Sequence, residues 1–156
     1  MAGTDSACAP DPVCLEAPLI CQTFNWSEAV AWAGVRVADF LAYAGLDVGA
    51  EDYVSFFSRD GCYFEALPAA MALDERTLLA TQLNGEPLPH EHGGPVRLVA
   101  PFLQGYKSVK WLGGVPVTRH DPVGTKRLLG QSKTGYLGAA WRQRFGIEAP
   151  AGDAQV

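Results

Sequence analysis

Apolar residues recur at helical spacing most clearly in residues 35–46. Four of them stand at positions i, i+3, i+4 and i+7: Val37, Phe40, Leu41 and Ala44. This spacing is typical of a helix that buries one face. Gly45 follows, and glycine commonly ends a helix because it adopts the left-handed conformation at little cost. The pattern therefore predicts a helix that ends near this glycine.

Aromatic and other β-favouring residues dominate two neighbouring runs, 53–58 and 62–66, which predict two adjacent strands or a hairpin. The sequence between them, Arg59-Asp-Gly61, is typical of a turn. Residues 68–80 are rich in Ala and Leu and predict one or two short helical turns, and Asn84-Gly85 predicts a tight turn.

Two further strands are predicted at 96–100 and 108–118, and a short helix at 138–145. Side chains alternate between the two faces of an extended segment. The second of these strands would therefore place two polar residues on one face, Ser108 and Lys110, and two apolar residues on the other, Val109 and Trp111. We expect the first face to be cationic and the second to enter the core.

The two ends of the chain lack such patterns. Residues 1–18 are rich in Ala, Pro and Asp, which predicts an irregular N-terminal arm, and residues 148–156 a flexible C-terminal tail. Residues 19–147 are then one domain, since a chain of 156 residues forms a single core. Seventeen glycines and eleven prolines disfavour a helical bundle and favour an α+β, mostly β fold.

Charge is distributed unevenly along the chain. Residues 1–96 hold three arginines and no lysine against fourteen acidic residues, a formal charge of −11, whereas residues 97–156 hold nine basic and three acidic residues, a charge of +6. Such a division within one small domain favours a bound anion or an acidic partner for the second half.

No apolar run approaches the ~18 residues that span a bilayer, so the chain is not expected to cross a membrane. No export signal is visible at its start, which predicts a cytoplasmic protein, or a periplasmic one if a leader has been removed. The four cysteines form no CxxC pair and no CxxCH motif, which disfavours a zinc site, a thioredoxin-like site and covalent haem. A disulfide framework is not expected in a chain of this length.

Several short motifs follow one another between residues 19 and 117. They are Cys21 with Asn25-Trp26-Ser27, Trp32-Ala-Gly-Val35, Ser58-Arg-Asp-Gly61, Leu78-Leu-Ala80 with Asn84-Gly-Glu-Pro-Leu88, His92-Gly-Gly-Pro-Val-Arg97, and Gly105-Tyr-Lys-Ser-Val-Lys-Trp111. Each motif is weak alone. In this order and at these spacings, they resemble the molybdopterin-binding domain of the sulfite oxidase family, in a minimal bacterial form.

The resemblance implies a sulfite-oxidase-like, mostly β fold with a few short helices and a Mo-molybdopterin cofactor. One protein cysteine completes the sulfur ligands of the metal, and by position it is Cys21. Molybdenum accepts soft thiolate ligands, and a nearby metal or cation favours the thiolate.

The resemblance also implies the residues that hold the cofactor. Arg97 offers a planar fork for phosphate oxygens, and Lys107 and Lys110 act as point charges. His92 would hydrogen-bond the cofactor, and the backbone around Ser108 and Val109 would line it.

Oxygen-atom transfer on a small-molecule substrate is the implied reaction. Cys21 would tune the metal, and Asp60 and Tyr63 are candidates for lining the mouth of the substrate site. No haem, flavin or iron–sulfur motif is present, so turnover would need an external electron-transfer partner, such as a cytochrome or a membrane haem subunit.

Two alternatives remain open. The domain could be a catalytically silent module that binds a pterin or a protein. The basic second half could instead bind nucleic acid, but the net charge of −5 and the lack of a nucleic-acid-binding motif argue against it.

Overall fold

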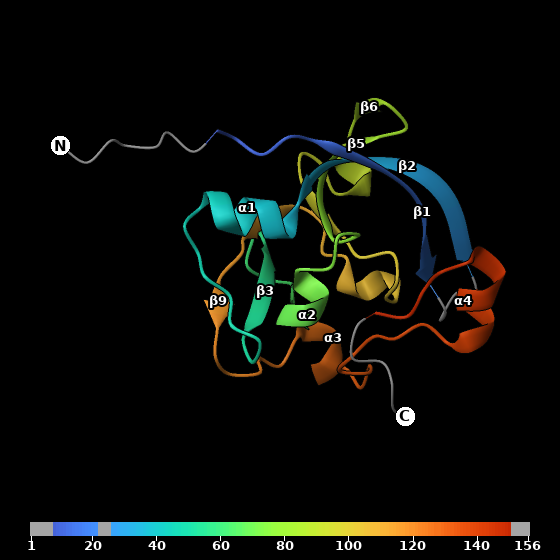
Figure 1. Cartoon of the computed structure of the whole chain (residues 1–156). Coiled ribbons are helices and arrows are strands. Elements are labelled where there is room, and N and C mark those ends of the chain that lie inside the picture. The colour runs from blue at the N-terminus through green and yellow to red at the C-terminus, as the bar shows by residue number, and fades with distance from the viewer. Residues whose placement is uncertain (1–7, 22–25, 151–156) are drawn as a thin grey trace.

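Two antiparallel sheets form the framework of the protein in a computed structural model that describes residues 8–21 and 26–150 (Figure 1). The first sheet contains β1 (Val13–Cys21), β2 (Trp26–Arg36), β5 (Leu78–Leu83), β6 (Glu86–Pro87) and β7 (Arg97–Val99). The second contains β3 (Tyr53–Ser58), β4 (Phe64–Pro68), β8 (Leu112–Gly114) and β9 (Val117–Thr118). The helices are α1 (Val37–Tyr43), α2 (Ala69–Ala72), α3 (Thr125–Leu128) and α4 (Ala139–Phe145), with 3-10 turns η1 (His90–His92) and η2 (Gly105–Lys107). The predicted α+β, mostly β fold is confirmed.

A long curved ribbon of β1 and β2 runs along one side of the molecule (Figure 1). The prediction that residues 1–18 are irregular is wrong from Val13 onward, because β1 pairs with β2 from Val13 opposite Gly34 to Cys21 opposite Trp26. Pro18 obscured this strand in the sequence. A proline is tolerated here because β1 is an edge strand, with β2 as its one strand partner in the described sheet.

The helix predicted at 35–46 is confirmed as α1, although its first two residues belong to β2. Gly45 follows its C-cap with a φ of +71°, the left-handed conformation expected there. The predicted hairpin is confirmed as β3 and β4, which pair antiparallel. The helical prediction for 68–80 is correct for α2 only, because residues 78–80 pair with β2 and β7 as part of β5.

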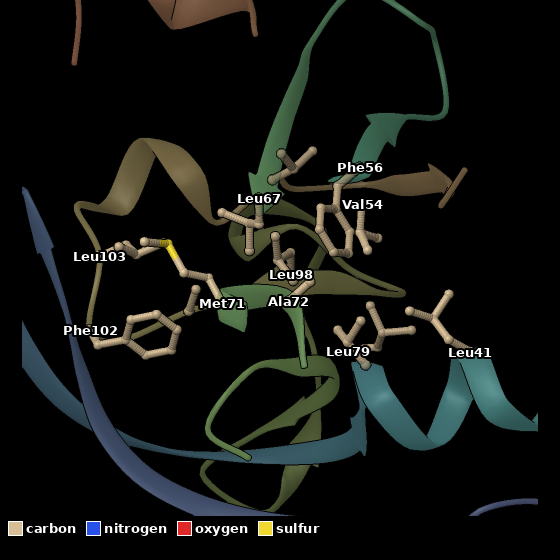
Figure 2. Close-up of a cluster of buried hydrophobic side chains, with 13 residues drawn as sticks. Leu41, Val54, Phe56, Leu67, Met71, Ala72, Leu79, Leu98, Phe102 and Leu103 are labelled. Carbon is tan, nitrogen blue, oxygen red and sulfur yellow. The ribbon is translucent and has the colours of Figure 1, made fainter. Parts of the chain in front are cut away.

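The core lies between the two sheets and is built from side chains of both. Phe56 of β3, Leu67 of β4, Leu98 of β7 and Met71 of α2 converge there with Phe102 (Figure 2). A smaller cluster that includes Trp32 and Leu78 lies under the ribbon. The larger cluster therefore supports β7 and the segment that follows it. The basic part of the chain begins at Arg97, the first residue of β7.

The alternation predicted for 108–118 holds at Val109, which is 1% exposed, and fails at Trp111, which is 37% exposed. Trp111 has a φ of +51°, which turns the chain, and its indole N–H donates to the carbonyl of His90 (2.7 Å). Regular pairing resumes only at β8. The helix predicted at 138–145 is confirmed as α4, and in the described ranges no helix is both long and apolar enough to cross a bilayer.

Candidate cofactor site

Two adjoining cavities open beside the segment that connects β7 to β8. The smaller, about 350 Å³, is lined by residues that include Ser58, Asp60, Tyr63, Tyr106, Ser108 and Lys126. The larger, about 490 Å³, is lined by residues that include Cys21, Val30, Trp32, Asn84 and His92. Arg97, Gly105 and Lys110 line both cavities and therefore stand at their junction.

Arg97 begins β7 and is 5% exposed. Its guanidinium donates to three main-chain carbonyls, those of His92 (2.8 Å), Ser108 (2.9 Å) and Leu98 (3.3 Å). The guanidinium also lies 5.3 Å from the centre of the Trp32 ring. These bonds use three of the five N–H donors of an arginine and fix the orientation of the fork, which leaves two donors available to an anion.

Lys110 is the second cation at the junction. Its ammonium donates to the carbonyl of Glu91 (2.8 Å) and lies 5.4 Å from the centre of the Trp111 ring. Across the described part of the chain, neither Arg97 nor Lys110 forms an ion pair with an acidic side chain.

Both cations are held at an electrostatic cost. Burial lowers the pKa of Arg97 to about 10, and burial together with the neighbouring charge of Arg97 lowers the pKa of Lys110. Carbonyl groups stabilise these charges but do not neutralise them, and a buried charge is stable only when it is paired. The junction therefore suits an anion that comes from outside the protein.

Cys21 ends β1 and is a free, partly buried thiol that lines the larger cavity together with Arg97 and Lys110. His92 lines the same cavity from η1, and its backbone carbonyl rather than its ring accepts the bond from Arg97. Among the described residues, no three His, Cys, Asp or Glu side chains are grouped closely enough to hold a metal ion. The donors present here, one thiol beside two cations, match a metal that arrives with its own anionic ligand.

Comparison with known proteins agrees with this chemistry. The sequence model for the oxidoreductase molybdopterin-binding domain matches residues 7–126, which is most of the chain. The chain belongs to that family. The resemblance drawn from the motifs is confirmed, and the predicted cofactor, Mo-molybdopterin, is that of the family.

Mitochondrial sulfite oxidase of Mus musculus is 44% identical over 98 residues, which are 58% of this chain and 18% of that protein. The uncharacterized oxidoreductase YuiH of Bacillus subtilis is 42% identical over 101 residues, 64% of this chain and 50% of YuiH. The chain thus spans half or less of the length of these two relatives. The sulfane dehydrogenase SoxCD of Paracoccus pantotrophus has the same fold, with a TM-score of 0.64 and 23% identity over 70% of this chain and 32% of that one.

Within this molybdopterin-binding domain, Asp60 and Tyr63 line the smaller cavity, whereas Cys21 lines the larger one. Asp60 accepts hydrogen bonds from the Ser58 hydroxyl (2.6 Å) and the Cys62 N–H (3.0 Å), which together lower its pKa. The Tyr63 hydroxyl donates to the carbonyl of Tyr106 (2.6 Å), and burial raises its pKa. Asp60 is thus a fixed acceptor and Tyr63 a neutral phenol.

Two predicted cofactor residues do not line either cavity. The ammonium of Lys107 is buried against the carboxylate of Glu65 (2.9 Å), so the structure places this predicted point charge in an internal ion pair rather than at either cavity. Val109 faces the core, and its backbone N–H and carbonyl bond to Lys107 and Leu98. Ser108 does line the smaller cavity, and its hydroxyl accepts the N–H of Ala100 (3.0 Å).

Several lining residues were missed in the sequence. Trp32, Asn84, Tyr106, Trp111 and Lys126 all contribute to one cavity or the other. Trp32, Asn84, Tyr106 and Trp111 lie within the motifs that carry the family resemblance, which was a usable signal. Lys126 lies beyond the motifs and is brought to the cavity only by folding. The Asn25-Trp26-Ser27 motif falls partly outside the described residues and its side chains are not described.

Proposed function

We propose that this chain is the cofactor-binding domain of a molybdopterin-dependent oxidoreductase that transfers an oxygen atom to or from a small-molecule substrate. The observation that carries the proposal is the cation pair at the cavity junction. Arg97 and Lys110 are buried or partly buried, have no acidic partner in the described chain, and share a cavity with a free cysteine.

The residues present fit the cofactor. Arg97 and Lys110 would hold its phosphate, since charged donors form the strongest hydrogen bonds to phosphate oxygens. Cys21 would supply a thiolate to the metal from the larger cavity. When bound, the molybdenum cofactor supplies two-electron oxygen-atom transfer at the metal. The protein contributes binding, orientation and electrostatics.

The two cavities suggest a division of roles. A substrate would meet the metal in the cavity that Cys21 lines, where Trp32 and Val30 supply apolar walls. Asp60 and Tyr63 would line the pterin instead, because an ionised carboxylate accepts hydrogen bonds from the N–H edge of a pterin ring. We propose this role in place of the catalytic one predicted from sequence. The pKa of Asp60 is lowered, and the hydroxyl of Tyr63 already donates a hydrogen bond to a carbonyl, so both residues suit positioning rather than proton transfer.

Electrons would be exchanged with a separate partner. The chain carries no haem or flavin motif, and a cytochrome or a membrane haem subunit would serve this role.

Metal and pterin analysis tests the proposal. Protein from a molybdenum-replete host should carry equimolar molybdenum and pterin. Arg97→Met should lower cofactor affinity about ten- to hundredfold, since hydrogen bonds to charged groups are worth roughly 1.5–3 kcal/mol. Arg119→Met, which removes an exposed arginine that lines neither cavity, is the matched control and should retain full cofactor.

A cysteine pair from one strand tests the metal ligand. Cys21→Ser should keep the fold but lose thiolate-to-metal absorption and activity, while Cys14→Ser, an exposed residue of β1, should change neither. Undiminished absorption in Cys21→Ser would remove Cys21 as the ligand. Pterin uptake without turnover in the unmodified chain would instead favour the silent binding module.

A further inference from the structure

The segment Gln104–Lys110, here called the strap, crosses between the two cavities. We propose that Glu65 and Lys107 are positioning residues that hold the strap in the shape required by the cofactor site. The proposal rests on the proposed function, because the site that the pair shapes is the one assigned to the cofactor. Neither side chain lines the two cavities at the site.

The strap joins the main parts of the site. Gln104 forms a bridge to Ile20, the residue before Cys21. Gly105 lines both cavities, and its close approach to the Ile20 carbonyl leaves little room for a side chain, since a Cβ would lie 3.3 Å from that oxygen. Ser108 accepts a bond from Arg97, and Lys110 is the last residue of the strap. A shift of the strap would therefore move Cys21, Arg97 and Lys110 relative to one another.

Lys107 pins the middle of the strap to the second sheet. It is 3% exposed, and its ammonium bonds to the fully buried Glu65 of β4 (2.9 Å) and to the carbonyl of Ala66 (3.4 Å). The other carboxylate oxygen of Glu65 accepts the backbone N–H of Lys126 (2.9 Å), a residue that lines the smaller cavity. One carboxylate thus holds two walls of the site.

The pair is sealed by a later segment, residues 124–135. A Cβ on Gly124 would overlap the carboxylate of Glu65, and a Cβ on Gly135 would lie 2.7 Å from Cγ of Lys107. The same segment bonds to the strap, since Gln104 N–H donates to the Gly135 carbonyl (2.7 Å) and the Tyr106 hydroxyl to the Ser132 carbonyl (2.5 Å). The chain beyond β9 therefore closes over the pair.

A buried ion pair is weak support for stability as such, because the cost of removing two charges from water offsets their attraction. Removing both partners should thus leave a folded protein, whereas removing one leaves an isolated buried charge. The double variant therefore separates positioning from stability. If the pair served stability alone, the double variant would recover both thermal stability and cofactor retention. If the pair positions the strap, the double variant would recover thermal stability but not cofactor retention.

The experiment compares Glu65→Gln, Lys107→Met, their double variant and Lys107→Arg in the full chain. In the double variant we expect near-parental thermal unfolding, about tenfold faster release of molybdopterin, as for residues that orient a metal's ligands, and faster hydrogen exchange in peptides covering residues 104–108. Lys107→Arg keeps the charge and should release cofactor at close to the parental rate. Arg119→Met, which removes an exposed arginine outside the strap and outside residues 124–135, is the control and should leave all three measurements unchanged.

Parental cofactor release and parental exchange in the double variant would overturn the proposal, since the pair would then be dispensable to the strap. If Lys107→Arg and the double variant both released the cofactor at the parental rate, the ion pair would not affect the site, and the proposal would be overturned as well. The exchange measurement uses cofactor-free protein. If the unmodified chain takes up no pterin, the proposed function fails, while exchange still reports whether the pair holds the strap.

Discussion

Lys107 and Lys110 lie three positions apart on one segment, but only Lys107 forms an ion pair in the described structure. Lys107 is buried against Glu65, so the protein neutralises its charge internally. Lys110 lies between two cavities beside Arg97, with a carbonyl and an aromatic ring as its contacts. The first lysine shapes the site, and the second is available to a ligand.

This difference shows that neighbouring cations in one segment can have different roles, one in structure and one in binding. A cation paired with a buried carboxylate contributes order, because its geometry is fixed by a partner of opposite charge. A cation held only by neutral groups retains its field and attracts an anion. The number of basic residues in the second half therefore overstates the charge available for binding.

The largest contrast is expected when each lysine is replaced by methionine in cofactor-free protein. Lys107→Met should lower the free energy of unfolding by about 3–5 kcal/mol, because it leaves the Glu65 carboxylate buried without its counter-charge. Lys110→Met should change it by less than about 1 kcal/mol, since no buried charge loses its counter-charge. Urea unfolding measures both values. Equal losses in the two variants would remove the distinction between these lysines.

An added anion should stabilise the cofactor-free protein by acting at the junction. Burial lowers the pKa of Arg97, so its charge disfavours folding at every pH at which the folded protein keeps that charge, and neutral pH lies in this window. Inorganic phosphate would offset this cost, by about 2.7 kcal/mol at a concentration 100 times its dissociation constant.

Thermal unfolding in phosphate and in sodium chloride of equal ionic strength measures the effect. Arg97→Met should abolish the response specific to phosphate, while Arg119→Met should preserve it. A parental response in Arg97→Met would place the anion elsewhere.

The smallest effect is expected with nucleic acid. Three of the nine basic residues in 97–156 form ion pairs within the described structure, namely Lys107, Arg127 and Lys133, and residues 1–96 carry a charge of −11 that repels a polyanion. We expect dissociation constants of about 10⁻⁴ M or weaker at physiological salt, the range of non-specific binding. Submicromolar binding in an anisotropy titration would instead show that the basic half acts as one continuous surface.

Local patterns predicted the elements that depend on neighbours in sequence. The spacing of Val37 and Leu41 specified α1, Gly45 its end, and the turn after Ser58 the hairpin of β3 and β4. The strand β1 was partly missed because its order comes from pairing with β2, which overrides the weak preference of an Ala- and Pro-rich segment. Trp111 was assigned to the core because alternation assumes an extended chain, and its positive φ breaks that assumption.

The sequence by itself identified the family and its cofactor, because the motifs occur in the order and at the spacings of that family. It also named Cys21, Arg97 and Lys110 as candidate ligands. Only the tertiary structure decided which cations remain available, since Glu65 stands 42 positions from Lys107 and meets it only when β4 packs against the strap. It also decided that Asp60 and Cys21 line different cavities. Ion pairing and cavity walls depend on contacts between distant segments, and residue type and spacing do not specify those contacts.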